Sequence, residues 1–394
     1  MCKGCELRRT AMRRRLAGEQ VKDICLGLGK SRGWFYYWAN RYDPDDITSL
    51  CDLPLGPHQA AGKVSPELEQ AIINSRRARM AKETPGMRYA LNGADAIQLE
   101  LMALEMEGVP TARTVHRILK RNDLVLPRQT QSAPDKPKKP YPAPEGNEIN
   151  AVHQFDWFGP CYLSGDSTKY YFPHLKDRGS RCFNLDCVTD RQSETLTNFL
   201  VASWQWMDIP DILQVDNAME IIGTSRYPRS FTQVVRFCLD VGVEVLFNAP
   251  TEPWRNGFIE SGHGLVQRLL LQQRFENYAS LRAEVPNFVR YCNSHHRHPA
   301  LGGKTSDEYC ADFEPNLLPP GYDKHLQRLS LKRGRISFIR MVSKNGNIRT
   351  LRSNKFHVDP DLKWHYVKAT VIVEEQVLQV YHQGELIKTF EYKI

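Results

Sequence analysis

Long hydrophobic runs are absent from this sequence. No stretch approaches the roughly 20 apolar residues that a membrane span requires. The N-terminal residues carry too much charge for a signal peptide, because arginines recur from Arg8 to Arg15. These absences predict a cytoplasmic protein with no membrane partner.

Regularly spaced cysteines are also absent, although the chain has ten cysteines. Only Cys2 and Cys5 form a C-x-x-C pair, and a structural zinc site would need a second pair at similarly short spacing. Cys25, Cys51 and His58 offer further ligand atoms, but at other spacings. We therefore interpret the cysteines as reduced and mostly buried, and we predict no structural zinc.

The composition indicates a folded protein of several domains. Hydrophobic residues make up 41% and charged residues 25% of the 394 residues, which are ordinary values for a globular chain. This length is too great for one core, so two to four domains are expected. The formal net charge of +8 favours a polyanionic partner such as nucleic acid.

Residues 1–62 predict a helix-turn-helix domain and a linker. A basic helix up to Leu16 precedes a helix over 19–26, Gly27 to Gly29 stop that helix, and Ser31 caps a third over 32–42. The last helix of this motif enters the major groove, and phosphate contacts come mostly from basic side chains. We predict DNA contacts by Arg13, Arg14 and Arg32, with an ordinary helical hairpin as the alternative.

Residues 63–126 predict a second domain of the same kind. Ser65 precedes a helix that starts at Pro66, a favoured first position for proline. A helix over 94–107 follows, and Thr111 caps a helix over 112–122. The predicted DNA contacts of this domain are Arg113, Arg117 and Lys120.

Proline and lysine dominate residues 127–148, which predict an extended linker rather than a helix or a central strand. Residues 149–310 instead alternate between short apolar runs and helical patterns. We expect strands over 151–157, 170–175, 182–188, 211–216 and 243–247, and helices over 194–207, 231–241 and 257–275. This order predicts an α/β core around a mixed five-stranded sheet.

Three acidic residues lie at predicted strand ends or near the start of a helix in that core. Asp156 and Asp216 end predicted strands, and Glu260 follows the turn at Asn256 and Gly257 that starts a helix. Ligand sites form at strand ends of open α/β sheets, and carboxylates suit Mg²⁺ or Mn²⁺. Two such ions can hold the attacking and the leaving oxygen of a phosphodiester. The acids together predict a two-metal site.

The residues around these acids resemble the DDE transposases and integrases with a retroviral-integrase-like core, and in layout the bacterial insertion-sequence transposases. The resemblance covers residues 149–310. Its motifs are HQFDW at 153–157, QVDN at 214–217, PWRNGFIE at 253–260, YCNSH at 291–295 and HPALG at 298–302.

The resemblance implies an RNase H-like fold in which Asp156, Asp216 and Glu260 are the catalytic residues and bind two Mg²⁺ ions, or Mn²⁺ as a substitute. It implies hydrolysis that frees a 3′-OH at each element end, and strand transfer by that 3′-OH without a covalent enzyme intermediate. It also implies that Asn217 and Asn256 position the substrate. Integrases often carry basic residues one and two turns past the third acid. Here those places hold Gly264 and Gln267, and Arg268 beside them is the predicted DNA contact.

Glu252 is a rival for the third acid, because it stands at the more compact spacing of the family from Asp216. Glu260 is preferred, because it lies on a helix after Asn256 and Gly257, whereas Glu252 lies in a proline-flanked loop. We expect the extra length between Asp216 and Glu260 at residues 223–229.

After a linker over 311–325, residues 326–394 contain six short β-runs with turns over 344–347 and 382–385. They predict a small SH3-like β-barrel. Basic residues crowd its first half, and we predict DNA contacts by Arg333 and Arg335. A barrel with an ordinary charged face is the alternative.

These features favour a Mg²⁺-dependent polynucleotidyl transferase, a transposase or integrase. Its partners would be double-stranded DNA, as element terminal repeats and target, and further copies of itself. A nucleoid location in a bacterial host is implied, and the need for a helper protein stays open. The alternatives are a catalytically silent DNA-binding regulator and an RNase H-like nuclease without joining activity.

Overall fold

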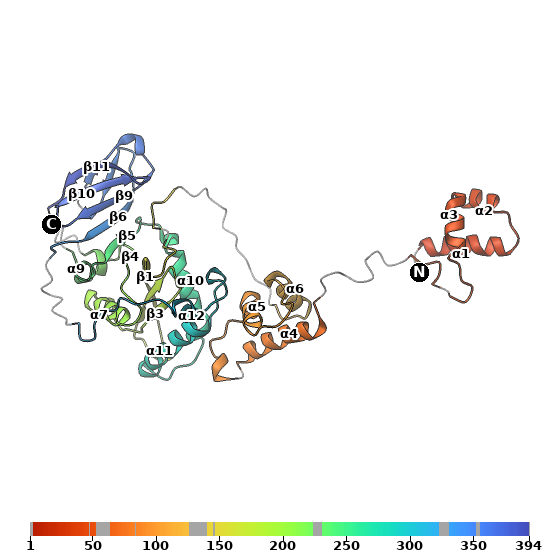
Figure 1. The fold of residues 1–394 in the computed structure, drawn as a ribbon, viewed down its shortest axis with the longest axis horizontal. Coiled ribbons are helices and arrows are strands. Elements are labelled where there is room, and N and C mark those ends of the chain that lie inside the picture. Colours follow the sequence, from red (N-terminus) through yellow and green to blue (C-terminus); the bar gives the residue numbers. More distant parts are fainter. Residues whose placement is uncertain are drawn as a thin grey trace. The chain divides into compact units, whose positions relative to one another are not determined.

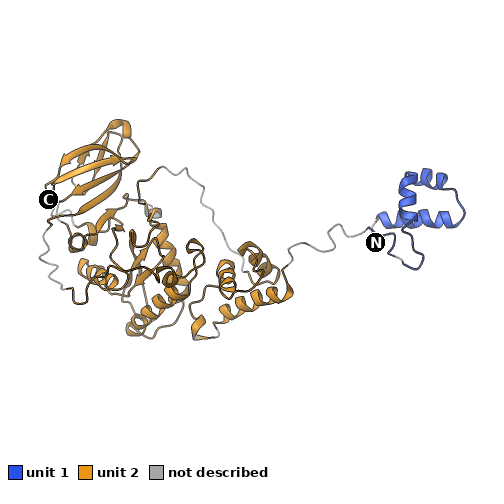
Figure 2. Ribbon diagram, viewed as in Figure 1, with its two compact units in different colours: residues 1–63 blue, residues 64–394 orange. Residues whose placement is uncertain are grey.

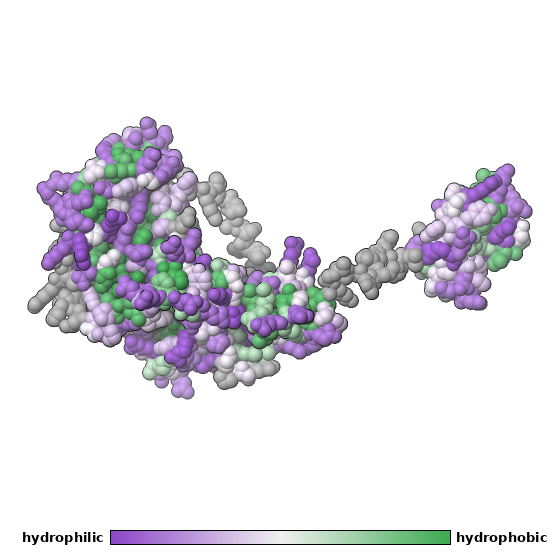
Figure 3. All heavy atoms as spheres, viewed as in Figure 1, coloured by the Kyte–Doolittle hydropathy of each residue, from purple (hydrophilic) through white to green (hydrophobic). Residues whose placement is uncertain are grey.

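The computed structural model describes residues 3–46, 48–52, 64–82, 84–125, 140–144, 146–223, 231–322, 331–351 and 355–393. The chain forms two compact units, residues 1–63 and residues 64–394 (Figure 2). Hydrophilic residues are interspersed with apolar ones on the visible face of each unit (Figure 3). Within the described ranges, no helix is long and apolar enough to cross a membrane.

The first unit contains the three helices expected from the sequence, α1 (Lys3–Leu16), α2 (Val21–Leu28) and α3 (Arg32–Ala39). Gly29 ends α2 with a left-handed φ of 66°, which glycine adopts at little cost. Ser31 caps α3, because its hydroxyl accepts a hydrogen bond from the Trp34 N–H at 3.1 Å. Phe35 and Trp38 anchor this unit's own core.

The second unit begins with α4 (Pro66–Ala81), α5 (Ala94–Ala103) and α6 (Ala112–Arg121), with a 3₁₀ turn at Pro85–Met87. Ser65 caps α4 as predicted, accepting from the Leu68 N–H at 3.2 Å. Thr111 is the N-cap residue of α6 as predicted, although its side chain makes no capping hydrogen bond. These helices share a hydrophobic core around Ile72, Ile97 and Val115.

The second unit is built on one sheet with the strand order β11-β10-β9-β6-β5-β4-β1-β2-β3 (Figure 1). Its first five strands are β1 (Val152–Cys161), β2 (Tyr170–Asp177), β3 (Phe183–Leu185), β4 (Ile212–Val215) and β5 (Glu244–Phe247). β1 pairs antiparallel with β2 and parallel with β4, and β5 is parallel to β4. The predicted mixed five-stranded sheet is therefore confirmed as part of a larger sheet.

Helices cover both faces of this sheet. One face, with Phe155 and Leu175, packs against α7 (Ser193–Trp204), α8 (Met219–Ile222) and α9 (Gln233–Asp240). The other face, with Phe172, packs against the segment that follows α10 (Gly257–Leu265) and against α11 (Tyr278–His295). A 3₁₀ turn (Pro253–Asn256) leads into α10, and further short helices are Pro299–Leu301 and α12 (Ser306–Cys310).

The helix predicted over 257–275 is shorter than expected. After Leu265 the backbone continues as a π-helical segment, Val266–Leu270. Such a segment widens the turn and shifts the following side chains around the helix axis. The apolar pattern alone does not distinguish this from a continuing α-helix.

The small C-terminal barrel is not confirmed. The strands β6 (Arg335–Met341), β9 (Tyr366–Ile372), β10 (Val377–His382) and β11 (Glu385–Glu391) extend the core sheet, while β7 (Asn347–Arg349) and β8 (Lys355–His357) form a separate pair. The described sheet stays open, because β6 pairs in parallel with β5, as in Phe247 with Phe338. The rings of these two residues stack at 5.1 Å. Local β-patterns predict the strands but not the edge that they join.

Candidate active site

Two predicted acids lie on neighbouring central strands. Asp216 directly follows β4, as expected. Asp156 lies inside β1 rather than at its end, because β1 continues to Cys161. The parallel pairing of β1 with β4 nevertheless stops at Gln154, so Asp156 stands just beyond the paired stretch.

The three predicted acids share one electrostatic environment. Burial, and then the negative charges of Asp216 and Glu260, raise the pKa of Asp156 to about 7. Burial also raises the pKa of Asp216. Both shifts are opposed by backbone N–H groups, from Trp157 at 2.8 Å and Ala218 at 2.9 Å, and by the positive charge of Arg191. Asp156 is thus subject to the negative charges of Asp216 and Glu260, whereas the carboxylate that adds to the shift at Asp216 is Glu220.

Glu252, the rival third acid, has other partners. It forms an ion pair with Arg255 at 2.9 Å and accepts a hydrogen bond from the hydroxyl of Tyr366. It is also absent from the charges that shift the pKa of Asp156, whereas Glu260 is among them.

The donor set fits a divalent cation in part. Asp156 and Asp216 supply hard oxygen donors, and their mutual repulsion is what a bound cation would relieve. Within the described ranges, however, no cluster of three or more His, Cys, Asp or Glu side chains could hold a metal ion. Glu260 is exposed on α10 and does not complete a three-ligand set in this conformation.

A close contact between a glycine and a histidine sets the position of α10. Asp156 faces His174 across the β1–β2 pairing, and His174 is buried below Gly262 of α10. A Cβ atom at Gly262 would lie 2.3 Å from Cε1 of this imidazole, closer than any real contact. Only glycine therefore lets α10, which carries Glu260, approach β2 at this point.

A buried network of amide side chains joins the elements that carry the acids. The Gln154 amide donates to Gln214 at 2.9 Å, Gln214 donates to Asn248 at 2.7 Å, and Asn248 donates to Asn256 at 2.6 Å. Asn217, next to Asp216, donates to the Asn248 backbone carbonyl at 2.7 Å. The predicted substrate-positioning residues Asn217 and Asn256 thus contact protein groups, which orient the loop after β4 and the start of α10.

Arg340 on β6 completes this network from the C-terminal strands. Its guanidinium donates to the side-chain oxygen of Asn217 at 2.9 Å and to the Asn248 carbonyl at 3.0 Å. It also donates to the carbonyls of Arg349 and Thr350, at 2.7 and 3.0 Å. The side chain is buried, and burial lowers its pKa to about 10. The sequence did not single out Arg340, His174, Asn248 or Arg191, because each acts through contacts between distant segments.

The predicted DNA-contacting residues are mostly solvent-exposed. This holds for Arg13, Arg32, Arg113, Arg117, Lys120, Arg268, Arg333 and Arg335. Arg14 differs, because it forms an ion pair with Glu19. The eight exposed side chains are accessible to a partner. Their contacts with DNA stay predictions.

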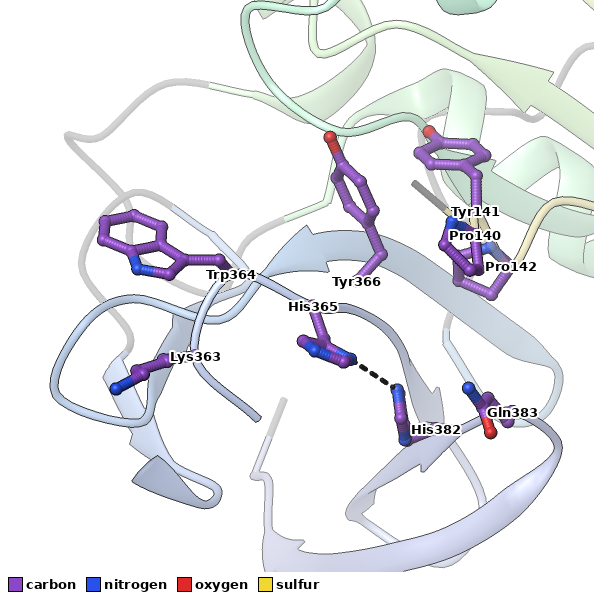
Figure 4. A pocket seen from close by; sticks show the side chains of 9 residues that line it. All are labelled: Pro140, Tyr141, Pro142, Lys363, Trp364, His365, Tyr366, His382 and Gln383. Carbon is purple, nitrogen blue, oxygen red and sulfur yellow. Dashed lines mark hydrogen bonds between the residues drawn. The ribbon is translucent and has the colours of Figure 1, made fainter. Parts of the chain in front are cut away.

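An apolar hollow of the second unit lies away from the acids. It has a volume of about 360 Å³ and is lined by Pro140, Tyr141, Pro142, Lys363, Trp364, His365, Tyr366, His382 and Gln383. Figure 4 shows His365 and His382 facing one another across it. Tyr141 connects it to the amide network, since its hydroxyl lies 3.3 Å from the side-chain oxygen of Asn248.

Comparison with protein families relates part of the core to integrases. Residues 241–305, which include Glu260, match the integrase core domain. This match bears out the predicted relationship to DDE integrases and transposases, and it supports a function of the integrase and transposase type. No curated protein matches the sequence.

Solved structures with a similar arrangement include retroviral integrases. One is a chain of the simian T-cell lymphotropic virus intasome in complex with PP2A regulatory subunit B56 gamma. Its sequence is 15% identical to this one, the TM-score is 0.37, and the match covers 64% of this chain and 78% of that chain. The HTLV-2 integrase catalytic core domain in complex with magnesium is 17% identical, with a TM-score of 0.32, over 41% of this chain and 97% of that one. At such low TM-scores, these likenesses carry no weight in assigning the site.

Proposed function

We propose, from the integrase core domain at residues 241–305 and the acids around it, that this chain is a DNA transposase or integrase. It would bind element ends, free their 3′-OH groups by metal-dependent hydrolysis, and join them to target DNA. The observation that carries this proposal is the match of residues 241–305, which include Glu260, to the integrase core domain. Asp216 directly follows β4, Asp156 lies on the neighbouring strand β1, and the charge of Glu260 on α10 acts on Asp156.

Asp156 and Asp216 would hold the divalent cations, with Glu260 as the third ligand. The bound ions would activate the attacking oxygen and stabilise the leaving one. The chain's own residues fix the geometry. The Trp157 and Ala218 N–H groups orient the two aspartates, and the amide network holds Asn217 and Asn256. The Gly262–His174 contact brings Glu260 within electrostatic reach of Asp156.

The test compares Asp216→Asn with the wild-type protein in a Mg²⁺-dependent assay on DNA that carries the terminal repeats flanking the gene. Mutation of residues that merely support metal ligands costs 10–100-fold. Loss of a ligand is therefore expected to lower cleavage and joining by at least about 100-fold. Unchanged activity would refute the metal site. Cutting without joined product in the wild type would favour a nuclease, and binding without cutting a silent regulator.

The third acid is tested in the same assay with a matched pair of variants. Glu260→Gln is expected to match the loss seen for Asp216→Asn. Glu252→Gln is expected to retain cleavage within about 10-fold, because Glu252 is already paired with Arg255. The reverse order of effects would make Glu252 the third acid.

A further inference from the structure

We propose that Lys176, Arg178 and Arg181 form a phosphate-binding site for the DNA backbone beside the predicted acids. This inference rests on the proposed function and names the substrate group that the same face of the core would hold. The three residues lie at the end of β2 and in the turn before β3.

All three cations converge on one aromatic ring, that of Phe258 in α10. The Lys176 ammonium lies 4.5 Å from the ring centre, the Arg181 guanidinium 4.8 Å and the Arg178 guanidinium 6.0 Å. Phe258 precedes Glu260 by two residues on the same helix. The cation cluster therefore borders the element that carries the predicted third acid.

Sheet register places Lys176 on the same face of the sheet as Asp156. In the β1–β2 pairing His174 faces Asp156, and Lys176 faces Gln154. Residues two apart on a strand point to the same face and lie about 7 Å from each other. A phosphate at Lys176 and one at Asp156 could therefore belong to a single DNA strand.

The positive charge of this cluster is not neutralised within the described chain. None of the three residues forms an ion pair with a carboxylate there. The nearby Cys292 thiol is neutral, because burial raises its pKa well above the ordinary value. Burial, and then the charge of Arg181, lowers the pKa of Lys176 to about 8 and also lowers that of Arg178. The cations repel one another, and an anion would relieve this repulsion.

A bound phosphodiester would neutralise the charge of these three cations, whereas their packing on Phe258 alone does not. The ring face attracts a cation, but it carries no net charge and cannot neutralise three of them. Lysine and arginine provide most contacts to the phosphates of a DNA backbone. The Arg178 guanidinium is also held in place, because it donates to the Pro144 carbonyl at 3.1 Å. The site would read no base sequence.

The experiment measures the binding of the full-length protein to a short fluorescein-labelled duplex of arbitrary sequence at several salt concentrations. For B-DNA, the slope of log K against log salt is about −0.9 per neutralised phosphate. The variant K176Q/R181N is expected to reduce the steepness of this slope by roughly 1–2. Asparagine replaces Arg181 because the φ of 65° there is left-handed, and asparagine tolerates that conformation.

Two further variants make the result decisive. The double variant R282Q/R297Q removes the same charge from arginines already paired with Asp186 and Glu308, and it is expected to leave the slope unchanged. R181N alone covers the case in which K176Q/R181N fails to fold, and it is expected to reduce the steepness by about 1. A wild-type slope in folded R181N would overturn the phosphate site while leaving the proposed function intact. Salt-independent or absent binding by the wild type would overturn both.

Discussion

The two central aspartates destabilise the folded protein at neutral pH, and this cost is measurable. The pKa of Asp156 rises from an ordinary value of 3.8 to about 7 on folding. Between these values the folded state binds more protons than the unfolded state, so stability falls as the pH rises. This loss of folding stability is absent below about pH 4 and reaches its full size above about pH 7.

Asp156→Asn is therefore expected to stabilise the metal-free protein at pH 8, by up to about 4 kcal/mol, and to lose this advantage near pH 4. Urea unfolding at the two pH values measures the difference. Asp211→Asn, at an exposed position, serves as the control and is expected to change little. Addition of Mg²⁺ should narrow the gap by stabilising only the wild type. A less stable Asp156→Asn protein at pH 8 would contradict the repulsion described here.

Arg340 offers a second test at the scale of single residues. Arg340→Lys replaces a planar group with several donors by a compact ammonium, which cannot reach Asn217, Asn248 and Thr350 together. Because Arg340 supports the loop that carries Asp216, DNA cleavage is expected to fall by about 10–100-fold. DNA affinity should be retained. The matched control is Arg290→Lys, at an exposed position of α11, and equal losses in both variants would argue against a positioning role.

At the scale of elements, α10 depends on one glycine for its approach to the sheet. Gly262→Ala would place a Cβ atom 2.3 Å from the buried His174 ring, and overpacking of this kind costs about 1–3 kcal/mol. Because the helix must shift, cleavage is expected to fall further than the stability loss alone explains. Thermal unfolding and the cleavage assay measure the two effects.

Gly264→Ala is the control on the same helix. Nothing lies within 4 Å of a Cβ atom there, and alanine is the better helix former by up to about 1 kcal/mol. This variant should be at least as stable as the wild type and fully active. If Gly262→Ala behaves in the same way, the glycine contact does not position Glu260.

The sequence predicts elements better than it predicts their partners. Apolar alternation predicts β1 to β5, and Asp216 and Glu260 stand out because strand ends and helix starts are visible locally, whereas β1 runs on past Asp156. Arg340 and Asn248 did not stand out, since the role of Arg340 arises only when β6 pairs with β5, and that of Asn248 only when it meets Gln214 of β4 and Asn256 before α10. The predicted barrel is not confirmed for the same reason. The sequence predicts β-runs at 336–341 and 366–373, but nothing local shows that the first of them joins an edge of the core.

At the scale of the whole molecule, the shared sheet makes the C-terminal strands part of the core fold. Phe338, Val371 and Tyr392 belong to the same hydrophobic cluster as Phe155 and Phe237 of the integrase-like core. Residues 1–63 form a separate compact unit with a core of its own. The two ends of the chain should therefore respond differently to truncation.

Removal of residues 331–394 is expected to abolish soluble expression, because it exposes the edge of β5 and removes one side of the main core. A chain that starts at Val64 is instead expected to fold, with the unfolding temperature of the remaining unit changed by only a few degrees. It should keep a salt-dependent affinity for arbitrary DNA through its own cations, and lose preference for the element ends. Expression, thermal unfolding and DNA binding of the two truncated proteins test this. A soluble, cooperatively folded chain ending at residue 330 would show that the C-terminal strands are a separable domain after all.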